Sequence, residues 1–117
     1  MCTPIKSFGS YIVTFEAQAE DITSRHHFIK HCGWTAAQFR NIQNYPFFTA
    51  HVVLWRDGEE VADQYLGACC YKTEKEFFTT YVGDYFSDMV AGCADESKDL
   101  ELIAMVNAWR DSLRNSF

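Results

Sequence analysis

Two histidines, His27 and His31, stand four residues apart in the segment His26-His27-Phe28-Ile29-Lys30-His31-Cys32. On a helix this spacing places both imidazoles on one face, where they can bind one metal ion. Zinc proteases with such a pair also have a glutamate directly after the first histidine, and Phe28 occupies that position here. Because no second pair of ligands is visible in the sequence, we predict no metal site and no cofactor.

Cysteine chemistry is the second option. The chain has five cysteines without the spacing of a disulfide framework or a CxxC motif: Cys2, Cys32, Cys69, Cys70 and Cys93. Cys69 and Cys70 precede a predicted helix start at Thr73, and a helix N-terminus can lower the pKa of a thiol. Such a nucleophile needs a base within reach, which would come from the histidines of residues 26–31. Adjacent cysteines at a strand end are more often packing residues, so we assign no catalytic residue.

Charge is distributed very unevenly along the chain. Residues 57–117 contain 13 Asp and Glu against five Lys and Arg, a net charge of −8, whereas residues 1–56 carry +2. With a pI near 5.0 and no basic stripe, direct binding of nucleic acid is disfavoured. A strong field of one sign instead favours a partner of the opposite sign.

The first half of the chain predicts a strand over residues 10–18, which are β-branched and aromatic. A helix is predicted over residues 22–32, with Asp21 as its N-cap and Gly33 in the left-handed position after its last turn. A second, short helix begins at Thr35, where the spacing of a capping box is present.

Residues 47–56 and 59–71 flank Asp57-Gly58, a dipeptide that suits a two-residue hairpin turn. With Arg56 opposite Glu59, the register divides the side chains between two faces of the hairpin. The predicted core face carries Phe48, Ala50, Val52, Leu54, Val61, Tyr65 and Cys69, with Asp63 as its one carboxylate. The other face carries Thr49, His51, Val53 and Trp55 with Glu60, Ala62, Gln64 and Leu66. There we expect Val53 and Trp55 to form an exposed apolar spot.

The last part predicts a helix after the capping box at Thr73, with a kink or break near Gly83-Asp84. A loop is predicted over residues 92–98 and a final helix over 99–114. The final helix would direct four side chains inward: Leu100, Ile103, Val106 and Leu113.

These elements predict one α+β domain over residues 1–117. It consists of a three-stranded antiparallel sheet, made of one strand and a hairpin, with about four helices packed on one face. No apolar run approaches the ~20 residues that span a bilayer, and the N-terminus lacks a signal peptide, so we expect a cytoplasmic protein without membrane contact.

The function predicted by elimination is a non-enzymatic protein-binding module. Its most concrete form is an acidic inhibitor or regulator that docks on a basic, nucleic-acid-handling partner, with carboxylates in the places of phosphates and aromatic anchors. Small proteins of mobile elements that block host defence offer an analogy of composition. The expected partner surface consists of Glu74, Glu76, Asp84, Asp88, Asp95, Glu96 and Trp55. The alternatives are a small cysteine and histidine enzyme or a structural subunit that self-associates, for instance as a homodimer.

Overall fold

The computed structural model describes residues 3–79 and 85–114 of the 117-residue chain. Its strands are β1 (Thr3–Phe8), β2 (Tyr11–Ala19), β3 (Phe47–Arg56) and β4 (Glu59–Cys70). Its helices are the π-helix η1 (His26–His31), α1 (Ala36–Arg40), α2 (Glu76–Thr79), α3 (Tyr85–Ser97) and α4 (Leu100–Arg114). The strands form one antiparallel sheet in the order β1-β2-β3-β4, which confirms a mixed helix and sheet fold.

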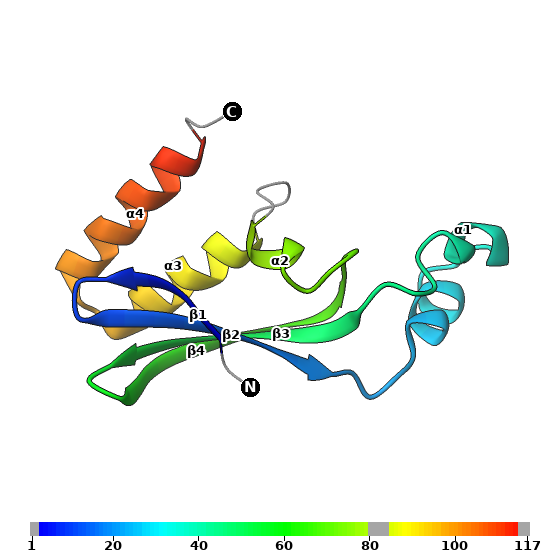
Figure 1. Cartoon of the computed structure of the whole chain (residues 1–117), viewed down its shortest axis with the longest axis horizontal. Coiled ribbons are helices and arrows are strands. Elements are labelled where there is room, and N and C mark those ends of the chain that lie inside the picture. The colour runs from blue at the N-terminus through cyan, green and yellow to red at the C-terminus, as the bar shows by residue number, and fades with distance from the viewer. Residues whose placement is uncertain (1–2, 80–84, 115–117) are drawn as a thin grey trace.

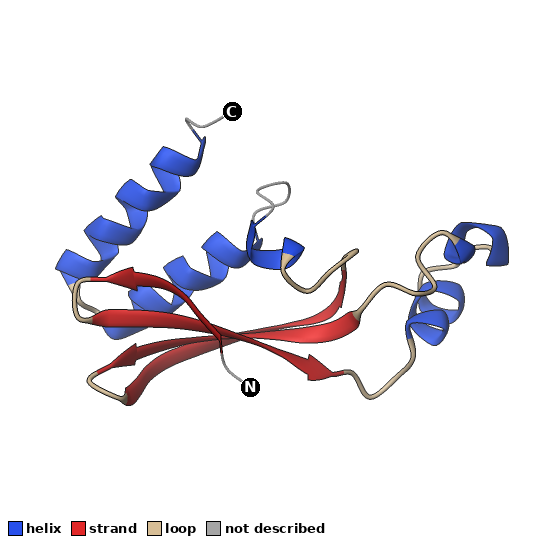
Figure 2. Cartoon of the chain, in the orientation of Figure 1, coloured by secondary structure: helices blue, strands red, loops and turns tan. Residues whose placement is uncertain are grey.

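The helices do not all cover the sheet. Helices α2, α3 and α4 lie on the same side of it, whereas η1 and α1 belong to the long connection between β2 and β3 and lie beyond the end of the sheet (Figure 1). Figure 2 shows the opposite side of the sheet without a helix, and we call this side the open face. The prediction that about four helices pack on one face is therefore wrong for η1 and α1. In the described ranges, no helix combines the length and apolarity that crossing a membrane requires.

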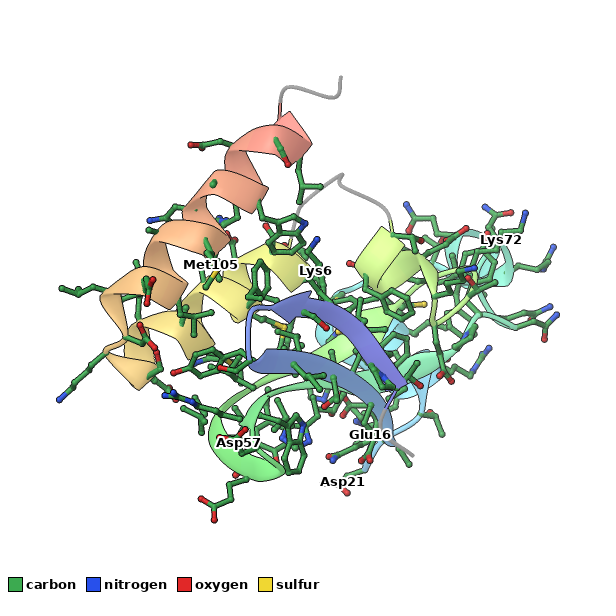
Figure 3. The ribbon with its side chains drawn as sticks, turned by 60° about the vertical axis from the view of Figure 1, so that its left-hand side comes forward. Lys6, Glu16, Asp21, Asp57, Lys72 and Met105 are labelled. Atoms are coloured by element: carbon green, nitrogen blue, oxygen red, sulfur yellow. The ribbon has the colours of Figure 1, made fainter. Side chains whose placement is uncertain are left out.

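The sheet has a fourth strand that the sequence analysis missed. Strand β1 pairs with β2 through a tight turn in which Gly9 has a φ of +60°, and Phe8 is the partner of Tyr11. Pro4 and Lys6 reduce the strand signal of this segment, but both residues suit an edge strand, which does not need every N–H for pairing. Met105 of α4 reaches the turn, with its Cε 3.8 Å from the place that a Cβ on Gly9 would take (Figure 3).

The hydrophobic core lies between the sheet and helices α2, α3 and α4. Alternate residues of β2 and β3 point into it, namely Tyr11, Val13, Phe15, Phe48, Ala50, Val52 and Leu54. The helices supply Phe77, Phe86, Met89, Val90, Cys93, Leu102 and Val106. Phe15 and Phe77 stack with ring centroids 5.5 Å apart, so aromatic contacts join the sheet to α2 inside the core.

The predicted hairpin register holds only next to its turn. Asp57 and Gly58 both have positive φ, and Trp55 pairs with Glu60 as expected. Beyond that pair, Val61 is an extra residue on β4, so Leu54 pairs with Ala62 instead of Val61. Such a β-bulge moves every following side chain of the strand to the other face.

A second bulge follows at Gly67 and Ala68, which together oppose Thr49, and Ala68 has a φ of +55°. Between the two bulges the predicted faces of β4 are reversed. Asp63 and Tyr65 lie on the open face, and Ala62, Gln64 and Leu66 lie on the helix side. Cys69 returns to the core, as predicted, but its partner is Phe48, two residues away from the partner that the predicted register gave it.

The helices after β4 also differ from prediction. Helix α3 continues through Gly92 to Ser97, so the predicted loop over residues 92–98 is wrong. Packing explains the glycine at position 92 within this helix, since a Cβ there would lie 3.1 Å from the side-chain amide of Gln64. The final helix is confirmed, but Leu100 is 80% exposed and Leu102 is fully buried in its place. The predicted break near Gly83-Asp84 lies outside the described residues.

Asp99 joins the start of α4 to the sheet. One carboxylate oxygen accepts hydrogen bonds from the backbone N–H groups of Glu101 (3.1 Å) and Leu102 (3.2 Å). The other accepts a hydrogen bond of 2.7 Å from the Tyr11 hydroxyl. The Tyr11 hydrogen bond and these backbone contacts lower the pKa of Asp99.

We expect Asp99→Asn to lower the melting temperature at pH 7. A carboxyl group with a lowered pKa in the folded state stabilises the fold above its unfolded pKa, and this stabilisation is lost as the pH falls through the folded pKa. The difference between the wild type and Asp99→Asn should therefore disappear in acid, well below about pH 4. Melting curves across that range test this; a difference that is constant with pH would contradict it.

Candidate functional site

The structure separates the residues of the predicted partner surface. Glu74 and Glu76 lie at the start of α2, and Asp95 and Glu96 lie near the far end of α3, which is about 20 Å long. Asp88 forms an ion pair with Arg110 of α4, which compensates its charge. Asp84 lies outside the described residues.

Trp55 lies on the open face of the sheet, away from the carboxylates of α3. Its indole N–H donates a hydrogen bond of 2.8 Å to the Thr14 hydroxyl, and its side chain is half-buried. Val53 is buried. The predicted exposed apolar spot of Val53 and Trp55 is therefore wrong, because cross-strand neighbours cover it.

Five carboxylates belong to the edge strand β4 and to helix α3, which packs against it. We call this group the acidic edge, and it consists of Glu59, Glu60 and Asp63 of β4 with Asp95 and Glu96 of α3. Gln64 links the two elements, since its amide donates a hydrogen bond of 2.9 Å to Glu96. Among the described residues, none of the five forms an ion pair with Lys or Arg.

The electrostatic effect of this group reaches the core beneath it. Burial, followed by the negative charges of Glu96, Asp63 and Glu60, raises the pKa of the Cys93 thiol to about 12. Carboxylates of strand β4 and of helix α3 therefore both raise the pKa of this one thiol. On the same strand Tyr65 is 59% exposed and Val61 is exposed as well, so apolar contact area stands beside the charges.

A row of hydrogen-bonded polar side chains crosses the open face next to the acidic edge. Gln18 donates hydrogen bonds to Glu16 (2.8 Å) and, at 3.3 Å, to Nδ1 of His51. On the other side of the ring, Nε2 of His51 lies 2.9 Å from Oδ2 of Asp63. Tyr65 stacks on the imidazole with centroids 4.0 Å apart and planes 3° apart. Figure 3 shows Glu16, the first residue of this row, on the side of β2 away from α4.

The bulge at Val61 assembles this group. Residues three apart on a regular strand point to opposite faces, so Glu60 and Asp63 would be separated without it. With the extra residue, both point to the open face, and ligand atoms of His51, Glu60 and Asp63 all lie within 4.8 Å of one another. This site was not predicted from the sequence, because a two-residue turn does not reveal a bulge three residues further on.

The helical segment that contains His26, His27 and His31 differs from the helix predicted over residues 22–32. Helix η1 is a π-helix, and Thr23 rather than Asp21 accepts the backbone N–H of His26. His26 and His31 are ring neighbours at 4.9 Å, and His27 and His31 are 6.4 Å apart. Gly33 has the predicted positive φ of +71°. Nε2 of His27 lies 3.6 Å from the sulfur of Cys32.

The cysteines at the end of β4 lack the features of a nucleophile. Burial raises the pKa of the Cys69 thiol to about 11 and raises the pKa of Cys70 as well. A cavity of about 290 Å³ lies beside them, lined also by Phe28 and Tyr85. A raised pKa is the opposite of what thiolate chemistry at neutral pH needs.

A cavity of about 650 Å³ lies beside β1, at the opposite edge of the sheet. Its lining includes Lys6, Lys75, Phe78, Phe86 and Trp109. Glu74 lies beside Lys75 at this edge, so the charges of the two lysines are partly compensated there.

Comparisons with family models, curated proteins and solved structures found no match to this chain. The site chemistry therefore rests on the geometry of this structure. The acidic edge can attract and hold a positively charged surface, and the group around His51 offers one imidazole and two carboxylates at one point.

Proposed function

We propose that this protein is a binding module that docks through its acidic edge on a protein with a basic, nucleic-acid-handling surface, as an inhibitor or regulator. The observation that carries the proposal is the presence of five carboxylates on the edge strand β4 and the neighbouring helix α3, none of which has a Lys or Arg ion-pair partner among the described residues. Carboxylates spaced along an edge can occupy positions that a phosphate backbone takes in a basic groove.

The exposed side chains of β4 supply the second component of an interface. Charged residues mainly set the association rate and the choice of partner, while aromatic anchors supply most of the affinity. Tyr65 projects from the same strand, with its ring supported by stacking on His51. A supported ring loses little conformational freedom on binding, which favours a role as an anchor.

Charge reversal of the acidic edge tests the proposal. The variant Glu59→Lys/Asp95→Lys/Glu96→Lys should slow association with the partner about tenfold or more and weaken its dependence on salt. Lysine is chosen because a charged side chain still protects the edge strand from aggregation. The partner is first isolated with the wild-type protein as bait, and association rates are then measured at several salt concentrations.

A matched control separates the edge from net charge. The variant Asp21→Lys/Glu74→Lys/Glu101→Lys changes the net charge by the same amount at exposed positions outside the acidic edge. It should alter the association rate less than about threefold. Equal effects of both variants would show that association depends on net charge and not on the acidic edge. An unchanged association rate in the first variant would refute the proposal. Nucleic acid should compete with the protein for the partner, and failure to compete would refute mimicry of a phosphate backbone.

A further inference from the structure

We propose that His51, Glu60 and Asp63 form a binding site for a divalent transition-metal ion, with Zn²⁺ as the most suitable ion. This inference goes beyond the docking function and does not depend on it, because ion binding is a property of the isolated protein. It departs from the sequence-based expectation of no metal site, which was argued from His27 and His31. The three ligands come from two neighbouring strands on the open face.

The distances between the donor atoms suit a shared ion. Two ligands bound at about 2.1 Å to one tetrahedral ion lie about 3.4 Å apart. Nε2 of His51 and Oδ2 of Asp63 are 2.9 Å apart, so a separation of about 0.5 Å more lets an ion replace the proton between them. The donor atom of Glu60 lies within 4.8 Å of both, which places it within reach of a third coordination position. Water can complete the coordination on the solvent side.

The imidazole is held in place before any ion binds. The His51 side chain is only 12% exposed, and Tyr65 stacks parallel to its ring. Its Nδ1 faces the amide of Gln18, which donates from Nε2, so Nδ1 accepts and Nε2 carries the proton that it shares with Asp63. A fixed ring lowers the conformational entropy that metal binding costs.

A metal ion can replace that shared proton. When an ion binds Nε2, the proton moves to Nδ1, and Gln18 can turn its amide to present the carbonyl oxygen to it, which exchanges its hydrogen bond to Glu16 for one from His51. Metal-binding histidines commonly donate their second N–H to such an acceptor, which orients the ring. Gln18 is therefore a positioning residue for the site.

The type of ligands selects the ion. Imidazole favours Zn²⁺ and its transition-metal neighbours, whereas Mg²⁺ and Ca²⁺ prefer sites made of oxygen ligands alone. Two carboxylates and one neutral imidazole also neutralise the charge of a divalent ion. The β-bulge at Val61 supports this assignment, because bulges re-aim side chains and are over-represented beside functional sites.

Isothermal titration of the tag-free protein with ZnCl₂ tests the inference. We expect one equivalent of Zn²⁺ to bind in the micromolar range, with a rise in melting temperature, and no comparable binding of MgCl₂. His51→Gln, Glu60→Gln and Asp63→Asn should each weaken Zn²⁺ binding by about tenfold or more. Glu59→Gln is the matched control: it removes an equal charge from the adjacent residue, on the helix side of the sheet, and should leave binding unchanged.

Three results would overturn the inference. The first is that the wild type does not bind Zn²⁺, and the second is that Glu59→Gln weakens Zn²⁺ binding as much as the ligand variants do. The third is binding that survives in Asp63→Asn but disappears in His27→Gln, which would assign the ion to His27 and Cys32. Should His51→Gln fail to fold, Mn²⁺ added to wild-type protein provides a measurement without substitution. Its paramagnetism should broaden the NMR signals of His51 and Val53 before those of His27, and the reverse order would also overturn the inference.

Discussion

Iodoacetamide at pH 7 should modify Cys32 at least about 100-fold faster than Cys69 and Cys93 in the native protein. Cys32 is exposed, whereas Cys69 and Cys93 are buried. Burial raises the pKa of Cys69 to about 11, so that only about one thiol in 10⁴ is ionised at pH 7, and the fraction for Cys93 is smaller. The thiolate is the reactive form, and burial also blocks access to the sulfur.

Mass spectrometry of peptides after timed labelling measures these rates. A Cys2→Ser background removes the cysteine outside the described residues. Labelling of Cys69 should become faster by about tenfold for each pH unit between 7 and 10, because the thiolate fraction rises until the pH reaches the pKa. In guanidinium chloride the cysteines should react at similar rates. Faster reaction of Cys69 or Cys70 than of Cys32 in the native protein would favour the cysteine enzyme instead of the binding module.

The second large effect, a loss of stability, is expected from substitution of Glu20. This residue follows β2 and binds the bulge at Gly67 and Ala68 of β4. Its Oε1 accepts a hydrogen bond of 2.5 Å from the backbone N–H of Ala68 and one of 2.8 Å from the Thr49 hydroxyl. Glu20→Ala leaves both donors without this acceptor in a half-buried position. The free energy of unfolding should fall by about 2 kcal/mol.

Urea denaturation followed by circular dichroism measures this change. With an ordinary m-value, a loss of 2 kcal/mol lowers the midpoint by about 1 M. Glu20→Gln keeps an oxygen acceptor and should lose less than half of that amount. Asp21→Ala changes the exposed neighbouring residue and should cost less than about 0.5 kcal/mol. An unchanged midpoint in Glu20→Ala would show that the bulge does not depend on the carboxylate.

The proposed functions make the position of the bulges important. The bulge at Val61 places Asp63 and Tyr65 beside His51, whereas Glu20 binds the bulge at Gly67 and Ala68, which follows them in the strand. Loss of the second bulge would move Cys69 to the other face and leave Asp63 in place. Zinc binding should therefore be kept in Glu20→Ala although the fold is less stable.

Local signals in the sequence determined much of the secondary structure. The strand over residues 10–18, the turn at Asp57-Gly58, the capping box of Thr35 and the final helix are all present, because each depends on residues close together in the chain. The left-handed position of Gly33 is another such case. The uneven charge of the two halves is also a property of the sequence alone.

Tertiary structure decided which residues meet. The side chain of Glu20 reaches the backbone of Ala68 across 48 residues, and Gly67 is a local signal of a bulge there that does not fix the register. The shift at Val61 turns Asp63 from an expected core carboxylate into a partner of His51. Strand β1 forms the edge of the sheet beside β2, and Gly92 of α3 lies against Gln64, whose side-chain amide would be 3.1 Å from a Cβ at that position. In each case the stabilising contact comes from a strand or side chain distant in sequence, which propensity and periodicity do not describe.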